Sequence, residues 1–153
     1  MAEGRVRAVH VAPTSGAPVE RREPVAAVAD RGLEGDRYFR DQGTFEGSDL
    51  TLVERETLRG VARDYDIAIE PGAHRRNVTT EGVALNHLVG ERFRVGSAVC
   101  VGERLCEPCS YLERLLEQRG VREALVHRGG LRARIVESGD VGIGDRIEPI
   151  TSE

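Results

Sequence analysis

Short runs in which apolar residues alternate with charged or polar ones are the main pattern along this chain. The segment Arg92–Val95 alternates charged and apolar side chains, and Val99 and Val101 do the same around Cys100. Glycine separates many of these runs, with 18 glycines in 153 residues, whereas an average protein has roughly 7%. The pattern predicts many short strands joined by turns. The predicted strands are residues 5–11, 24–29, 49–53, 77–80, 91–95, 98–105, 131–137 and 145–150.

Two segments have helical spacing instead. In the first, Leu58, Val61, Ala62 and Tyr65 fall at i, i+3, i+4 and i+7, on one face of a helix. In the second, the leucines at 112, 115 and 116 form an apolar stripe. A shorter helical turn is predicted over residues 122–126.

Both helices have a predicted start. Thr51 and Glu54 have capping-box spacing ahead of the first helix, and Ser110 and Glu113 have it ahead of the second. Gly120 is a suitable residue to end the second helix. With no linker or internal repeat in view, residues 1–153 are predicted to form a single domain. The predicted fold class is mainly β, a small barrel with a few peripheral α-helices.

The charged residues narrow the range of chemistry. All 22 basic residues are arginine, and 26 acidic residues bring the net charge to −4. Without lysine the chain cannot hold pyridoxal phosphate as a Schiff base, nor place a P-loop lysine on a nucleotide. Any bound anion must be held by arginine, hydroxyl or backbone N–H groups. The acidic balance and the absence of tryptophan argue against a nucleic-acid partner.

The apolar runs are short. None approaches the 18 residues of a membrane-spanning helix, and the first residues lack the apolar core of a signal peptide. We therefore expect no membrane association and a cytoplasmic location. In a reducing cytosol, Cys100, Cys106 and Cys109 are expected to be thiols.

The segment Cys106–Cys109 is the first candidate for chemistry. Cys109 directly precedes the predicted helix start at Ser110, and the partial positive charge of a helix N-terminus lowers the pKa of a thiol. A thiolate there can attack sulfur, carry a persulfide or bind a soft metal. Two buried small side chains beside a turn explain the motif equally well. Zinc is disfavoured because only Cys100 and four scattered histidines remain as further ligands.

Arg75, Arg76 and Asn77 are the second candidate. They follow a turn and enter a predicted strand, and together they offer many donors to a phosphate or carboxylate. Neighbouring side chains in a strand point to opposite faces, so at most one of the two arginines faces a given site. A solvated, charged strand edge is the alternative interpretation.

Two further segments carry arginines next to glycine-rich turns. Gly32–Arg37 contains a tight turn with Arg37 beside it, which can present backbone N–H groups and a guanidinium to an anion. Arg132 and Arg134 lie on the same face of a predicted strand, either toward a site or toward solvent. The turn-rich segment 139–145 lacks the dinucleotide fingerprint, so it is interpreted as a hairpin that closes the barrel.

In their order and spacing, these segments resemble the MOSC domain, the C-terminal domain of molybdenum cofactor sulfurases. The resemblance extends from about residue 6 to about residue 150, and the length is similar to that of stand-alone bacterial MOSC proteins. The matching segments are Gly32–Arg37, His74–Asn77, Leu88–Gly96, Glu107–Cys109 and 130–146.

The resemblance implies a barrel-like fold that binds the molybdenum cofactor, a pterin dithiolene (molybdopterin) with a terminal phosphate. It implies that Cys109 carries sulfur or binds molybdenum. It also implies that arginine-rich positions anchor the cofactor, and we add Arg134 from a predicted strand to these positions. The predicted cofactor-binding residues are Arg37, Arg75, Arg76, Asn77 and Arg134. Tyr38 and Phe39 stand where many relatives carry a histidine, so that histidine's role is not transferred.

Three functions stay open at this point. The first is a cofactor-binding oxidoreductase that reduces N-hydroxylated compounds, with Cys109 on molybdenum and a separate redox partner as electron donor. The second is a sulfur carrier in which Cys109 receives a persulfide from a cysteine desulfurase. The third is a non-enzymatic anion-binding or cofactor-binding module, or a dithiol redox module that uses Cys106 and Cys109.

Overall fold

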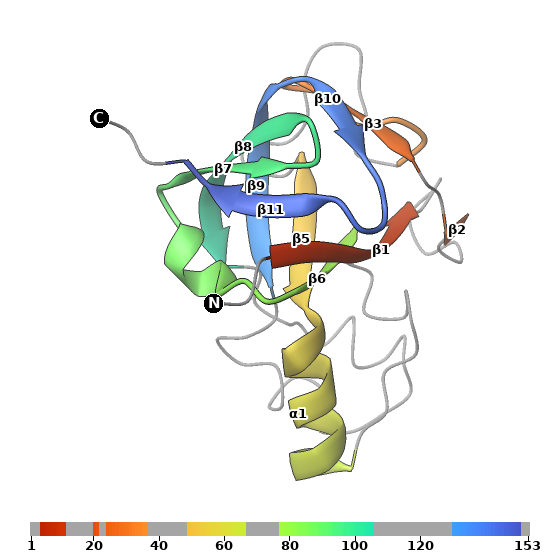
Figure 1. Cartoon of the computed structure of the whole chain (residues 1–153), viewed down its shortest axis with the longest axis vertical. Helices are drawn as coiled ribbons and strands as arrows, with labels where there is room; N and C mark the ends of the chain where they lie inside the picture. The colour runs from red at the N-terminus through yellow and green to blue at the C-terminus, as the bar shows by residue number, and fades with distance from the viewer. Residues whose placement is uncertain are drawn as a thin grey trace.

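A computed structural model of the chain describes residues 4–11, 20–21, 24–36, 49–66, 77–105 and 130–150. Seven strands form a closed barrel, because β11 pairs with both β7 and β1 at the two ends of the strand order (Figure 1). The mainly β, barrel-like fold predicted from the sequence is therefore confirmed. The barrel strands in order are β11 (Arg146–Pro149), β7 (Arg92–Val95), β8 (Ala98–Leu105), β9 (Leu131–Glu137), β5 (Leu50–Glu54), β6 (Val78–Glu81) and β1 (Gly4–Val11).

Four further strands complete the described sheets. The two-residue strand β2 (Glu20–Arg21) pairs with the end of β1, and β10, β3 and β4 form a separate small sheet. Its strands are β10 (Gly139–Val141), β3 (Val25–Val28) and β4 (Gly32–Leu33). The predicted hairpin over 139–145 is wrong, because β10 leaves the barrel to pair with β3. The barrel is closed instead by the next strand, β11.

The core fills the inside of the barrel, as period-2 alternation requires. In β9, Leu131, Ala133 and Ile135 are fully buried, whereas Arg132 is half-buried and Arg134 is exposed. The predicted alternation over 92–95 is observed in the same way, with the phenylalanine and valine buried and both arginines exposed. Each fully buried large side chain contributes about 1.5–3 kcal/mol through the apolar surface that it removes from water.

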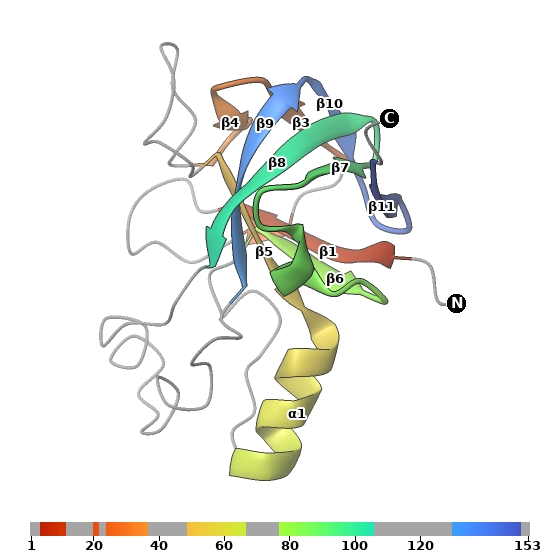
Figure 2. The same cartoon turned by 90° about the vertical axis from the view of Figure 1, so that its left-hand side faces the viewer.

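Helix α1 (Arg55–Tyr65) follows β5 without a break and projects from one end of the barrel (Figures 1 and 2). Val61 from the predicted apolar face is buried, but Ala62 and Tyr65 are exposed. The predicted capping box is wrong: the N-cap is Glu54, which makes no side-chain capping bond. Thr51 lies within β5, where its hydroxyl is bonded across the sheet. The predicted helix from Ser110 lies outside the described residues.

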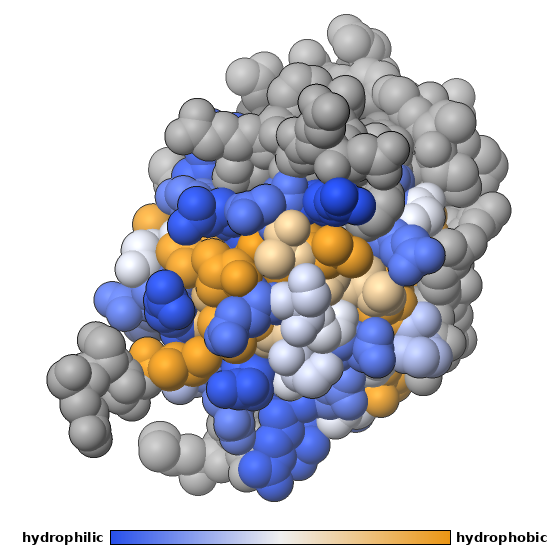
Figure 3. Space-filling model, turned by 90° about the horizontal axis from the view of Figure 1, so that it is seen from above, coloured by the Kyte–Doolittle hydropathy of each residue, from blue (hydrophilic) through white to orange (hydrophobic). Residues whose placement is uncertain are grey.

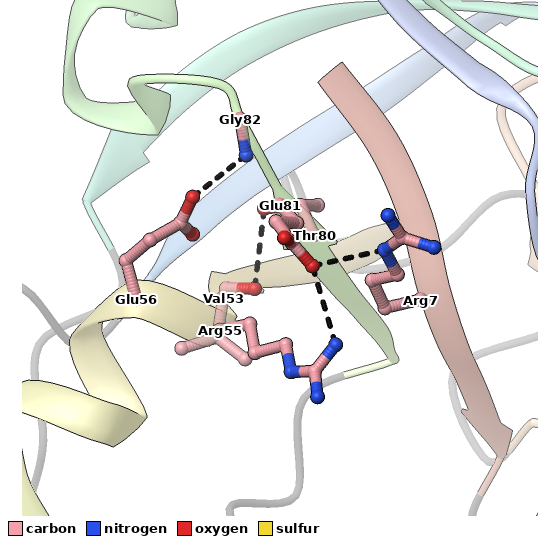
Figure 4. A network of polar contacts seen from close by, with 7 residues as sticks. All are labelled: Arg7, Val53, Arg55, Glu56, Thr80, Glu81 and Gly82. Atoms are coloured by element: carbon pink, nitrogen blue, oxygen red, sulfur yellow. Dashed lines mark hydrogen bonds and ion pairs between the residues drawn. The ribbon is translucent and has the colours of Figure 1, made fainter. Parts of the chain in front are cut away.

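Polar contacts attach the start of α1 to the barrel (Figure 4). The carboxylate of Glu81 on β6 accepts from Arg7 of β1 at 2.9 Å and from Arg55 of α1 at 3.2 Å. Glu56 of α1 accepts from the N–H of Gly82 at 2.7 Å. Partial burial on its own would raise the pKa of Glu81, but the ion pair with Arg7 and the charge of Arg55 lower it below its ordinary value. The network fixes the direction in which α1 leaves the barrel.

Apolar side chains are not confined to the core. Figure 3 looks onto the end of the molecule opposite α1, where apolar side chains lie among hydrophilic ones. The 3-10 helix η1 (Leu85–Leu88) inserts Leu85 and Leu88 into the core, and Val89 beside it is 42% exposed. Among the described residues, no helix is long and apolar enough to cross a membrane.

Candidate functional site

One transverse row of polar residues crosses five neighbouring strands of the barrel, from β1 through β6, β5 and β9 to β8. The N–H of His10 on β1 donates to the carbonyl oxygen of Asn77 at 2.7 Å. The side chain of Asn77 in turn contacts Thr51 on β5. Thr51 stands opposite Arg132 on β9, and Arg132 stands opposite Arg104 on β8. We call these five residues the polar row.

The polar row lies on the outside of the barrel, because the residues on either side of it along β1, β5 and β9 belong to the core. Three of its members are nevertheless almost completely covered: His10 is 6%, Thr51 8% and Asn77 6% exposed. Arg132 is half-buried and Arg104 is exposed. The row therefore runs from a covered polar layer at β1 to an open cationic end at β8.

Asn77, predicted as a cofactor-binding residue, has a structural task in this row. Its Oδ1 accepts from the backbone N–H of Thr51 at 3.0 Å and from the Thr51 hydroxyl at 3.1 Å. Its Nδ2 donates to the carbonyl oxygen of His10 at 3.2 Å, and its own N–H donates to the Thr51 hydroxyl at 3.1 Å. The side chain thus joins β6 to both of its neighbours. One of the two Nδ2 hydrogens takes part in none of these contacts. The cofactor role of Asn77 stays a prediction.

Arg134, the other predicted anchor that the structure describes, lies on the same outer face. Its guanidinium Nε is 3.5 Å from Oε1 of Glu103, and the Arg134 side chain is 50% exposed. An exposed ion pair of this kind contributes at most about 1 kcal/mol, so it holds Arg134 only weakly. Arg134 can therefore turn toward a ligand at small cost, and its anchoring role also stays a prediction.

The remaining predicted site residues, Arg37, Arg75, Arg76 and Cys109, lie outside the described residues, as does Cys106. The described strands nevertheless show where the chain enters or leaves the barrel close in sequence to Arg76 and Cys109. Arg76 is bonded to Asn77, and Arg104 precedes Cys109 by five residues. Asn77 and Arg104 belong to the same row, three strand spacings apart, which is about 14 Å along the sheet. The two predicted segments thus join the barrel at one level.

Cys100 is the one cysteine that the structure describes, and it lies in the core with no exposed surface. Burial first, and then the nearby carboxylate of Asp49, raises the pKa of the Cys100 thiol to about 12. A thiol that stays protonated at neutral pH is neither a good nucleophile nor a good metal ligand. Within the described ranges, no three His, Cys, Asp or Glu side chains are grouped so that they could hold a metal ion.

Sequence reasoning missed three members of the polar row. The spacing of Thr51 and Glu54 predicts a helix cap, although the place of Thr51 in a predicted strand is an alternative signal. His10 has no sequence signal, because a single histidine in a strand carries little information about function. No sequence motif marks Arg104, because only the register shift in β8 places it opposite Arg132.

Comparison with solved structures supports the fold. The YUAD protein from Bacillus subtilis superposes with a TM-score of 0.81 at 20% identity, covering 99% of this chain and 98% of that one. YiiM from Geobacillus stearothermophilus gives 0.77 at 18% identity, covering 97% and 75% of the two chains. YiiM from Escherichia coli gives 0.72 at 19% identity, covering 100% and 72%. At such identities the likeness concerns the fold alone.

Comparison with sequences shows the family. No curated protein sequence gives a significant match to this chain. The family model of the MOSC domain matches residues 33–148. This match extends from β4 to β11 and includes four of the five residues of the polar row. The resemblance inferred from the sequence motifs is thereby confirmed, and the chain belongs to the MOSC domain family.

Proposed function

We propose that this protein binds the molybdenum cofactor and reduces N-hydroxylated compounds, with Cys109 as the molybdenum ligand. Membership of the MOSC family, which is associated with this cofactor, supports the proposal. The observation that carries it is the polar row: its arginine end adjoins the segment with Cys109, and its Asn77 adjoins Arg75 and Arg76.

The donors of the predicted site residues suit part of this cofactor. Arginine side chains match the terminal phosphate, because guanidinium groups bind phosphate oxygens through paired hydrogen bonds. Arg134, with Arg37, Arg75 and Arg76, would hold the phosphate, and the thiolate of Cys109 would bind the metal as a soft ligand. When bound, the cofactor supplies oxygen-atom transfer. The net reaction consumes two electrons and two protons per N–OH group and yields an N–H group and water.

The metal content of the purified protein tests the proposal. The chain is expressed in cells with an intact cofactor pathway, and molybdenum per chain is measured by mass spectrometry of the metal. We expect stoichiometric molybdenum in the wild type and in Cys106→Ser, and a loss of most of it in Cys109→Ser. Wild-type protein without molybdenum would refute the proposal, and equal loss in both variants would refute the assignment to Cys109.

A sulfur-carrier function is the second candidate, and the burial of Cys100 restricts the sulfur-carrying role to the other cysteines. Since Cys100 is an inert thiol, sulfur transfer would fall to the other two cysteines. The Cys109 thiolate would attack the outer sulfur of a desulfurase persulfide, keep that sulfur as a persulfide and release the desulfurase thiolate. Intact mass after incubation with a cysteine desulfurase and cysteine should then increase by one sulfur atom. The increase should persist in Cys106→Ser and disappear in Cys109→Ser.

A further inference from the structure

We propose that Arg7, Arg55 and Arg59 form a binding site for a phosphate monoester on the outer face of the barrel, beside the start of α1. We call these three residues the arginine cluster. The carboxylate of Glu81 partly occupies this site. The proposal goes beyond the function above, because Glu81 lies four residues after Asn77, which is about 13 Å along the strand.

Two members of the arginine cluster converge on one oxygen atom. Nε of Arg7 on β1 donates to Oε2 of Glu81 at 2.9 Å, and Nη1 of Arg55 on α1 donates to the same oxygen at 3.2 Å (Figure 4). Each guanidinium thus uses one N–H group on this oxygen, although an arginine has five. A ligand with several oxygen atoms can engage both arginines through paired bonds, which one carboxylate oxygen cannot do.

Arg59 adds a third positive charge to the cluster. It lies four residues after Arg55, on the same face of α1, and it is exposed. Partial burial acts to raise the pKa of Glu81, but the charges of the arginine cluster hold this pKa below its ordinary value. All three positive charges therefore act at the position that the Glu81 carboxylate occupies.

The arginine cluster has an excess of positive charge. Three guanidinium groups act on one carboxylate, so two positive charges are left over, whereas the whole chain has a net charge of −4. The carboxylate of Glu54 accepts instead from the N–H of Leu85 at 3.2 Å. That of Glu56 accepts from the N–H of Gly82 at 2.7 Å, on the other side of β6 from Arg7 (Figure 4). Both of these carboxylates are thus held toward the connection to η1.

The site is open to solvent, and its charges match a phosphate monoester. The side chains of Arg7 and Arg55 are 44% and 45% exposed, and that of Glu81 is 30% exposed. Exposed ion pairs contribute little to stability, so an anion can bind beside Glu81 or displace it without breaking a strong contact. A phosphate monoester has a charge of about −2 at neutral pH and three acceptor oxygens. It therefore suits both the excess charge and the forked N–H groups of the cluster.

Binding of phenyl phosphate to the full chain tests the proposal. A phosphorus NMR titration measures the dissociation constant, at low ionic strength because salt screens exposed charges. We expect saturable binding to the wild type and about a tenfold loss of affinity in Arg7→Gln and in Arg55→Gln, since each removes a charge-assisted contact. Arg94→Gln is the matched control, because Arg94 is an exposed arginine on β7. Absence of saturable binding in the wild type, or the same loss in the control, overturns the proposal.

Replacing Glu81 should have the opposite effect on affinity. Glu81→Gln removes the competing negative charge and keeps a side-chain oxygen that can accept from both arginines. We expect this variant to bind phenyl phosphate several-fold more tightly than the wild type, since like charges no longer repel. Equal or weaker binding by Glu81→Gln would overturn the proposal.

A conservative variant separates binding from a purely structural role. Arg7→Lys keeps the positive charge, and with it the attraction to Glu81, but it lacks the forked guanidinium. We expect it to unfold at the wild-type temperature and to bind phenyl phosphate with an affinity between those of the wild type and Arg7→Gln. If Arg7→Gln is less stable than both proteins yet binds phenyl phosphate as tightly as they do, the role of Arg7 is structural and the proposal is overturned.

Two further measurements identify the phosphate compound. Dimethyl phosphate is a diester with a single negative charge, so it should bind more weakly than phenyl phosphate; equal binding overturns the assignment to a monoester. Molybdenum per chain should be unchanged in Arg7→Gln and Arg55→Gln. Parallel loss of molybdenum and of phenyl phosphate binding would overturn the proposal of a separate site. Phenyl phosphate binding by a wild type without molybdenum refutes the proposed function and supports this inference; molybdenum without phenyl phosphate binding does the reverse.

Discussion

Replacing Asn77 with alanine tests whether this side chain holds the barrel together. The substitution removes both bonds that Oδ1 accepts from Thr51, at 3.0 and 3.1 Å, and the 3.2 Å bond from Nδ2 to the carbonyl oxygen of His10. The backbone bonds between β1 and β6 remain. The variant therefore isolates the contribution of the asparagine side chain.

The size of the effect follows from which groups lose their partner. The N–H of Thr51 is buried and loses its acceptor, which costs about 1–3 kcal/mol. The hydroxyl of Thr51 can rotate, and the carbonyl of His10 keeps further accepting capacity, so these two add less. We expect Asn77→Ala to lower the free energy of unfolding by about 2–4 kcal/mol in total. For a chain of this length that corresponds to a fall in Tm of about 4–16 °C.

Thermal and denaturant unfolding followed by circular dichroism measure this effect. Asn86→Ala is the matched control, because Asn86 lies exposed in η1, and exposed substitutions usually change stability by no more than about 0.5 kcal/mol. The reasoning is refuted if Asn77→Ala and Asn86→Ala unfold at the same temperature. Unchanged stability of Asn77→Ala together with a loss of molybdenum would show that the side chain serves the cofactor rather than the sheet.

Three further predictions concern close packing, thiol burial and a half-buried carboxylate in the barrel. At Gly102 a Cβ atom would overlap the carbonyl oxygen of Leu88, so Gly102→Ala should cost about 1–3 kcal/mol, whereas Gly142→Ala, with its nearest atom at 3.7 Å, should unfold like the wild type. Cys100, with its pKa raised to about 12, should resist alkylation at pH 8 in the folded protein and react after unfolding; rapid labelling of native protein at this cysteine would contradict its burial. Burial raises the pKa of Glu54 above its ordinary value of 4.5. The native state therefore holds a proton there at pH values at which the unfolded chain has lost it. Stability consequently falls as the pH rises from 4.5 through the native pKa. Glu54→Gln should therefore be more stable than the wild type at pH 7, and the difference in stability should shrink as the pH is lowered toward 4.5. Parallel urea titrations of both proteins measure this difference. A constant difference across this pH range would count against the argument.

The strands could be predicted from the sequence almost completely. All eight predicted strands are present, each end within one residue of the observed bound. In β7 and β9 a period-2 alternation reflects a buried inner face and an open outer face, so the pattern survives in the sequence. The strands that were missed, β2, β4 and β10, are two or three residues long. Such short segments contain too few residues for a period to be recognised.

The local chemistry was harder to predict because one side chain can serve two structural purposes. Thr51 and Glu54 have the spacing of a capping box, yet β5 extends through Glu54 and separates Thr51 from the helix. In the strand, the hydroxyl of Thr51 is bonded to Asn77, from a segment 26 residues away in the sequence. A pairing between distant segments cannot be inferred from local spacing, and it decides between the two purposes here.

The bulge in β8 shows the same limit at the candidate site. Counting residues along a regular strand places Glu103 opposite Arg132, which would make the outer face of β8 and β9 an ordinary pair of opposite charges. The register shift between Gly102 and Arg104 adds one residue there, so Arg104 also stands opposite Arg132, and the sequence has no signal for this. Because a bulge sets two residues of one strand against one residue of its partner, a single extra residue changes which charges face the partner strand.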